Sequence, residues 1–180
     1  LLLDGWSLRR GPEGDYAAQV AADGFTFDLS FAPSQALLLQ GEGGYSRKGS
    51  RPEQASYYYS LPQLAVSGTV AIEKARLAVT GRAWLDHEWS SELLPDVAQG
   101  WDWIGINFDD GSALMAFRLR DGNGGALWSS ASIHQANGRS EILPAEAVAF
   151  EPLRDWRSPR TGITYPVEWR FRLGRRELLL

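Results

Sequence analysis

Apolar side chains recur at every second position through much of the chain. Phe25, Phe27, Leu29 and Phe31 alternate with polar residues, and residues 165–173 repeat the pattern. Successive side chains of a β-strand point to opposite faces, so this alternation predicts strands with one buried face each. We find no long segment with the period of an amphipathic helix. The sequence therefore predicts an all-β fold.

Turn-forming dipeptides separate the predicted strands at short intervals. Asp110-Gly111 divides residues 101–108 from residues 113–120, and Asn137-Gly138 marks another turn. Such dipeptides readily adopt the positive φ angles that tight hairpins need. Glu73-Lys74 predicts a further turn between two strands. Short strands joined by hairpins indicate an antiparallel barrel, a sandwich or a strongly bent sheet, and a barrel would enclose an apolar cavity.

Composition excludes several classes of function. The net charge is -4 and the basic residues form no long run, so we expect no nucleic-acid partner. The chain has no cysteine, which excludes disulfides and thiolate chemistry. With two histidines and no cysteine, we expect neither a dedicated metal site nor another cofactor. No apolar run reaches the ~20 residues that a membrane span requires.

We expect one β-domain over residues 1–180. The chain begins with Leu1-Leu2-Leu3 and ends with three more leucines, so we expect a piece of a longer chain whose two ends lie in strands. The expected order is first strands in 1–40, a Gly-rich charged loop in 41–56, central hairpins in 57–150, a Pro-containing connector in 151–164, and interdomain or second-domain strands in 165–180.

The groups best suited to acid–base chemistry gather in residues 81–89 and 101–103. These two segments hold four of the eight tryptophans and one of the two histidines. Strand alternation places His87 and Trp89 on one face and Trp84, Asp86 and Glu88 on the other. Only one of these faces can line a given cavity unless a bulge intervenes. The segment therefore predicts two rival catalytic sites.

In the first rival site, the general acid is His87 or a carboxylate tuned by burial, and the indole of Trp89 shelters a cation, an interaction of about 0.5–2 kcal/mol. In the second, Asp86 and Glu88 face inward with Asp102, and paired carboxylates share a proton. A third interpretation is purely structural, because buried polar groups normally hold neighbouring loops by hydrogen bonds.

Further residues are candidates for the wall of a ligand cavity. Ser46-Arg47-Lys48-Gly49 could hold an anionic head group, although a solvated loop is the commoner use of such a run. Tyr57 and Tyr59 share one strand face, and Tyr58 lies on the other. The proposed ligand-binding side chains are aromatic or apolar: Trp84, Trp89, Trp101, Trp103, Tyr57, Tyr59, Met115 and Phe117.

A series of motifs in fixed order resembles a known family. The motifs are residues 42–49, 55–60, 64–68, 81–89, 100–103 and 158–162. Together they resemble the family that unites carotenoid 1,2-hydratases (hydroxyneurosporene synthases) with AttH-like proteins described as secreted hydrolases. The resemblance implies a lipocalin-like fold built from two related β-domains, of which this chain would form the first.

The same resemblance implies a lipophilic ligand. The hydratases add water across the terminal double bond of an acyclic carotenoid, and their His-x-Trp pattern matches His87 and Trp89. In the strand that follows, the resemblance implies a tyrosine and an aspartate in the hydratases. The comparable stretch of this chain has Phe117 and Arg118 instead, which argues against an identical hydratase mechanism. We expect hydration or cyclisation of an isoprenoid-like substrate. The alternative is a non-catalytic lipid carrier that works with an ABC transporter. The resemblance implies a periplasmic, secreted or envelope-associated bacterial protein.

Overall fold

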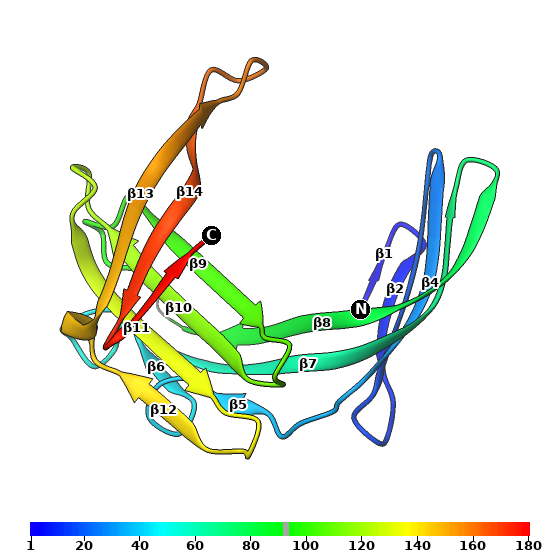
Figure 1. The fold of residues 1–180 in the computed structure, drawn as a ribbon, viewed down its shortest axis with the longest axis horizontal. Coiled ribbons are helices and arrows are strands. Elements are labelled where there is room, and N and C mark those ends of the chain that lie inside the picture. The colour runs from blue at the N-terminus through cyan, green and yellow to red at the C-terminus, as the bar shows by residue number, and fades with distance from the viewer. Residues whose placement is uncertain (92–93) are drawn as a thin grey trace.

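The computed structural model describes residues 1–91 and 94–180. Every regular element in these residues is an antiparallel β-strand, except for η1 (Ala145–Ala147), a single turn of 3-10 helix. Figure 1 shows a strongly curved, open U, with both termini inside its mouth. The predicted all-β, strongly bent architecture is confirmed. Within the described residues, no helix has the length and apolar character needed to cross a bilayer.

The first sheet has eight strands and contains the floor and one arm of the U (Figure 1). The hairpin predicted at Glu73-Lys74 joins its two longest strands, and Glu73 takes the positive φ of 53°. The strands are β1 (Leu2–Leu3), β2 (Trp6–Arg10), β3 (Tyr16–Ala22), β4 (Phe25–Ala32), β5 (Leu38–Leu39), β6 (Tyr45–Arg47), β7 (Ala55–Ile72) and β8 (Ala75–Trp89).

Two smaller sheets form the other arm. The second sheet has the order β12-β11-β10-β9, and the third has the order β13-β14-β15. The hairpins predicted at Asp110-Gly111 and Asn137-Gly138 are present in the second sheet. The strands are β9 (Gly100–Asn107), β10 (Ala113–Arg120), β11 (Ala126–His134), β12 (Ser140–Leu143), β13 (Val148–Arg157), β14 (Thr164–Leu173) and β15 (Arg176–Leu179).

Two predicted irregular segments contain strands instead. Residues 41–56 include β6 and the start of β7, so the long loop is only partly correct. The connector expected over 151–164 is correct only for 158–163, because β13 continues to Arg157 and pairs with β14, which begins at Thr164. Pro152 is tolerated there because the register of β13 shifts directly after it, and a proline lacks the N–H that a regular ladder needs.

Strand β7 turns a corner at Gln63. Leu61 pairs with Leu85 and Leu64 with Ala83, so two residues of β7 are opposed by one residue of β8. Gln63 lies in this bulge with a φ of 54° and is buried. Its amide nitrogen Nε2 donates to the carbonyls of Phe108 and Ser112 at 2.8 and 2.9 Å. These bonds fix the second sheet against one half of the β7–β8 pair.

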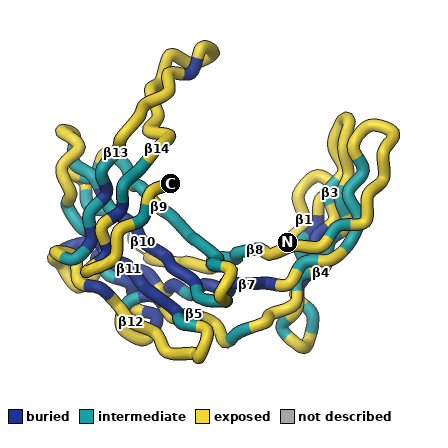
Figure 2. The backbone as a smooth tube through the Cα atoms, in the orientation of Figure 1, coloured by how far each residue is buried: buried dark blue, intermediate teal, exposed yellow. Residues whose placement is uncertain are grey.

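Burial is concentrated in that half of the molecule. The buried segments gather around β10, β11 and the first half of β7, whereas the arm containing β3 and β4 is mostly exposed or intermediate (Figure 2). Phe25 is exposed, and Phe27 is only half-buried. The alternation in β4 is confirmed, but its apolar face is only partly buried. Full burial requires a second layer packed on that face, which the alternating pattern alone does not supply.

Candidate ligand pocket

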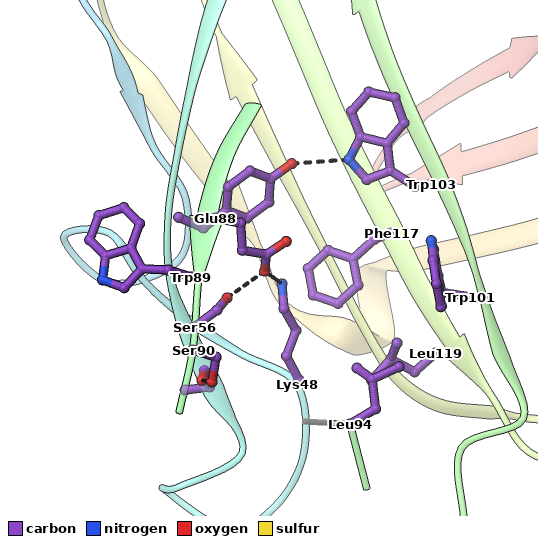
Figure 3. A pocket seen from close by; sticks show the side chains of 12 residues that line it. Lys48, Ser56, Glu88, Trp89, Ser90, Leu94, Trp101, Trp103, Phe117 and Leu119 are labelled. Atoms are coloured by element: carbon purple, nitrogen blue, oxygen red, sulfur yellow. Dashed lines mark hydrogen bonds and ion pairs between the residues drawn. The ribbon is translucent and has the colours of Figure 1, made fainter. Parts of the chain in front are cut away.

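A cavity of about 420 Å³ lies between the end of the β7–β8 pair and strands β9 and β10 (Figure 3). Aromatic and aliphatic side chains dominate its wall, and the charged groups come from the β6 and β8 side. The lining residues are Lys48, Ala55, Ser56, Tyr58, Glu88, Trp89, Ser90, Leu94, Trp101, Trp103, Phe117 and Leu119.

The pairing register decides which side chains of β7 and β8 reach this cavity. Tyr58 lies opposite Glu88, and Ser60 lies opposite Asp86. Because side chains alternate along both strands, these four residues share one face, here called the pocket face together with Ser56. The opposite face of the same strands carries Tyr57, Tyr59, His87 and Trp89.

The polar wall of the cavity centres on an ion pair between Lys48 and Glu88. The ammonium Nζ lies 2.8 Å from Oε1 of Glu88 and donates to the hydroxyl of Ser46 at 3.1 Å. The Ser56 hydroxyl donates to the same Glu88 oxygen. The Lys48 ammonium also lies 4.1 Å from the ring centre of Phe117. Burial lowers the pKa of Lys48, and the hydrogen bond and charge of Glu88 oppose that shift.

Tyr58 forms the neighbouring part of the wall. Its side chain is buried, and its hydroxyl oxygen accepts a hydrogen bond from Nε1 of Trp103 at 3.0 Å. Burial raises the pKa of Tyr58 strongly, and the negative charge of Asp86 raises it further. The hydroxyl therefore keeps its proton throughout the physiological pH range and offers a neutral polar group to the cavity.

Asp86 belongs to the pocket face but stands outside the set of cavity-lining residues. Its Oδ1 accepts hydrogen bonds from the Ser60 hydroxyl at 2.6 Å and from Nε1 of Trp84 at 2.7 Å. Ser60 in turn accepts a bond from the buried amide of Gln40 at 2.8 Å. Trp84 packs edge-on against Trp103, with ring centres 6.3 Å apart. Asp86 thus joins the pocket wall to a buried network behind it.

His87 lies on the opposite face of β8. Its Nδ1 is hydrogen bonded to the Tyr59 hydroxyl at 2.8 Å, and its ring centre lies 5.0 Å from that of Trp89. Trp89 stacks on Tyr57 at 5.7 Å, and both side chains are at least half exposed. Trp89, at the end of the strand, borders the cavity as well. Tyr57, Tyr59 and His87 do not line it.

The remaining predicted wall residues divide into two groups. Trp101, Trp103 and Phe117 line the cavity. Met115 is buried in the core behind it, in the same cluster as Tyr58 and Phe117, and Trp84 packs against that cluster without lining the cavity.

Asp102 does not join Asp86 and Glu88. It forms an ion pair with Arg118 at 2.6 Å and lies 3.1 Å from Nε of Arg120. Arg118 also donates to the carbonyl of Phe150 at 3.0 Å, so this pair holds β13 against the second sheet.

The sequence placed Lys48 only in a run that could hold an anionic head group, and Tyr58 was not proposed as a cavity residue. Lys48 follows a short strand hidden in a Gly-rich stretch, so no strand face could be assigned to it. For Tyr58 a signal existed: alternation separated it from Tyr57 and Tyr59, and pairing with β8 would have put it beside Glu88. In residues 1–91 and 94–180, no three acidic or histidine side chains are grouped as metal ligands. The other missed lining residues are Ala55, Ser56, Ser90, Leu94 and Leu119.

Comparison with solved structures gives two relatives. A protein from Nitrosomonas europaea assigned as AttH is 47% identical, with a TM-score of 0.94, and the match covers 97% of this chain and 55% of that one. Kievitone hydratase from Nectria haematococca is 19% identical, with a TM-score of 0.78, and the match covers 97% of this chain and 54% of that one. This second likeness concerns the fold alone.

The chain spans just over half the length of either solved structure. A search among curated proteins finds no match. The profile of the AttH-like family, by contrast, matches residues 1–180. Together with the bent, antiparallel, lipocalin-like sheet and the 47% identical structure, this match places the chain in the AttH-like family.

Proposed function

We propose that the cavity binds a lipophilic, isoprenoid-like molecule and that the complete protein adds water to it. The observation that carries the proposal is the cavity itself: about 420 Å³, walled by Trp101, Trp103 and Phe117, with its charged groups on one side. Small-molecule sites are typically apolar hollows of about 300–1,000 Å³ with a few placed polar groups. The fold shared with a hydratase supports this choice of reaction.

Adding water to an isolated alkene requires a proton donor and a shelter for the resulting cation. In the proposed mechanism, Glu88 takes a proton from the Lys48 ammonium, which burial destabilises, and gives it to one alkene carbon, so that the cation forms beside the aromatic wall. An aromatic face attracts a cation by about 0.5–2 kcal/mol, depending on how dry the site is. Water then adds to the cation, and the Glu88 carboxylate, held by Lys48 and Ser56, takes up the proton that this water releases.

Within this proposal, Asp86 supports the acid indirectly. It is hydrogen bonded to Ser60 and Trp84, and its charge acts on the Tyr58 hydroxyl in the wall. His87 is the rival catalyst and serves only a ligand bound on the opposite face. The two assignments therefore predict different variants to be inactive.

The test uses the protein at its full natural length with lycopene or neurosporene in heavy-oxygen water. Mass spectrometry should detect a product that carries one added water with the label. We expect Glu88→Gln to abolish this product and His87→Ala to retain it. Retained activity in Glu88→Gln together with loss in His87→Ala would move the reaction to the opposite face.

A second candidate function is a non-catalytic lipid carrier. It is favoured by the partners of the two carboxylates, since Glu88 is paired with Lys48 and Asp86 is bonded to Ser60, an arrangement that also suits a passive wall. We propose that such a carrier would work in the bacterial periplasm or envelope with an ABC transporter. Native mass spectrometry that finds co-purified lipid, with no turnover in the labelling assay, would favour the carrier.

A further inference from the structure

The Lys48–Glu88 ion pair gives the cavity a polar wall with no net formal charge. The Lys48 side chain is 13% exposed and that of Glu88 is 39% exposed, so the lysine lies deeper. The Lys48 ammonium stands over Phe117 at 4.1 Å and Tyr58 at 5.0 Å, which are both buried lining residues. A ligand that fills the cavity must therefore meet a desolvated cation and its carboxylate partner together.

The arrangement leaves hydrogen-bonding directions for a ligand. Lys48 donates to Ser46 and lies against Oε1 of Glu88, and an ammonium has three donors. The Ser56 hydroxyl donates a hydrogen bond to the same Oε1. Figure 3 shows the second carboxylate oxygen of Glu88 turned away from Lys48. One donor and one acceptor of opposite formal charge thus stand side by side at the wall.

A charged head group would upset this balance. A ligand carboxylate would meet Glu88, and a ligand ammonium would meet Lys48, in a site where charges are poorly solvated. A hydroxyl can accept from the lysine and donate to the glutamate, and a carbonyl can accept from the lysine, with no unpaired charge added. The neighbouring Tyr58 hydroxyl is already engaged by Trp103 and Asp86 and adds no further charge.

We propose that the Lys48–Glu88 pair selects ligands with an uncharged, oxygen-bearing head group on an apolar chain, against the matching carboxylic acid or amine. This inference rests on the proposed lipophilic pocket and names the class of molecule that the pocket takes. The pair acts as a charge-matching filter at the wall, while Trp101, Trp103 and Leu119 accept the chain.

The test is a binding series with farnesol, farnesoic acid and farnesylamine at neutral pH, followed by tryptophan fluorescence. We expect the wild-type chain to bind farnesol roughly tenfold more tightly than either charged probe, which corresponds to about 1.4 kcal/mol. Glu88→Gln leaves the lysine charge unmatched and should shift the preference to farnesoic acid. Lys48→Met leaves the glutamate unmatched and should shift the preference to farnesylamine. Lys48→Arg keeps the charge and should retain the preference for farnesol.

The matched controls are Lys74→Met and Glu13→Gln, which change the same charges at exposed turns remote from the cavity. They should leave the order of the three affinities unchanged, and circular dichroism checks that every variant is folded. Equal binding of all three probes, or an order unaltered by both Glu88→Gln and Lys48→Met, would overturn the charge filter and leave the pocket standing. Failure of all three probes to bind the wild-type chain would overturn the pocket and the filter together.

Discussion

The two faces of the β7–β8 pair carry different chemistry although alternating residues of the same two short segments form them. On the pocket face, Tyr58 is 3% exposed and bonds to Trp103 across the cavity. On the opposite face its neighbour Tyr57 is 56% exposed and stacks on Trp89. Both faces carry aromatic and acid–base groups. The difference is that the second sheet covers only one of them.

This contrast shows how a rich motif can be misleading when it is taken as one cluster. His87 and Glu88 are adjacent in sequence, yet one is bonded to Tyr59 and the other to Lys48. A carboxylate paired with a buried cation beside a hydrocarbon wall is suited to recognition or proton transfer. For an exposed histidine such as His87, water competes with any ligand for the hydrogen bonds of the ring. Variants of neighbouring residues can separate the two roles.

The largest expected difference lies in stability. Tyr58→Ala removes a buried ring and should lower the free energy of unfolding by about 3–5 kcal/mol. Tyr57→Ala removes an exposed ring and should cost less than about 1 kcal/mol. Urea unfolding of both variants measures the comparison. Equal losses would mean that the second sheet does not cover the pocket face as described.

A smaller effect is expected for ligand binding at the far wall. Trp101 is 62% exposed yet lines the cavity, so Trp101→Ala should weaken farnesol binding roughly tenfold while barely changing stability. Trp156→Ala is the control, because Trp156 is similarly exposed on β13 and does not border the cavity. Calorimetric titration gives both affinities. An equal loss in the control variant would point to a second binding surface.

The pH dependence of stability offers a third distinction. Burial and the charge of Asp86 raise the pKa of Tyr58 above its ordinary value of 10.0. The unfolded chain then releases this proton first, so the stability from Tyr58 is intact below pH 10.0 and falls as the pH rises above it. Tyr58→Phe should flatten that fall in urea titrations at successive alkaline pH values. A fall of unchanged steepness would contradict the buried, protonated hydroxyl.

Lys48 changes the pH dependence of stability in the opposite direction, both in the wild type and in Tyr58→Phe. Burial lowers its pKa, so the folded chain releases the proton first and stability from this group rises with pH up to about the ordinary value of 10.5. Because Lys48 is present in wild type and in Tyr58→Phe, its contribution cancels in the difference between their stability curves.

The smallest effect is expected on the opposite face. His87→Ala loses one exposed hydrogen bond to Tyr59 and should change the free energy of unfolding by less than about 0.5 kcal/mol. Farnesol affinity should also stay the same, as measured by the titration used for Trp101→Ala. Marked weakening of binding in this variant would place the ligand on the His87 face and sharpen the case for the rival site.

Much of the fold could be predicted because short local sequences specify its turns. Asp110-Gly111 and Asn137-Gly138 mark hairpins wherever they stand between alternating segments. Residues 41–56 and 151–164 were harder because β6 is only three residues long and β13 contains Pro152 at a register shift. Both strands are specified by their partners rather than by their own composition.

The candidate site could be predicted only in part. Alternation separated His87 from Asp86 and Glu88, but it contains no information about which face another sheet covers. That choice is made by packing between β7 and the distant β10, through Tyr58, Phe117 and Leu119. Lys48 enters the cavity from a segment with no recognisable period, so its role depends wholly on tertiary structure.

The corner at Gln63 has a consequence for the order in which the protein can be made. The amide of Gln63 is satisfied by carbonyls of Phe108 and Ser112, which lie 45 and 49 residues later in the chain. When β7 and β8 leave the ribosome, Phe108 and Ser112, whose carbonyls fix the bend at Gln63, have therefore not yet emerged. Contacts of such long range slow folding, and the pocket face stays uncovered until they form. The nascent chain thus exposes the pocket face of β7 and β8 for the time needed to synthesise one further hairpin.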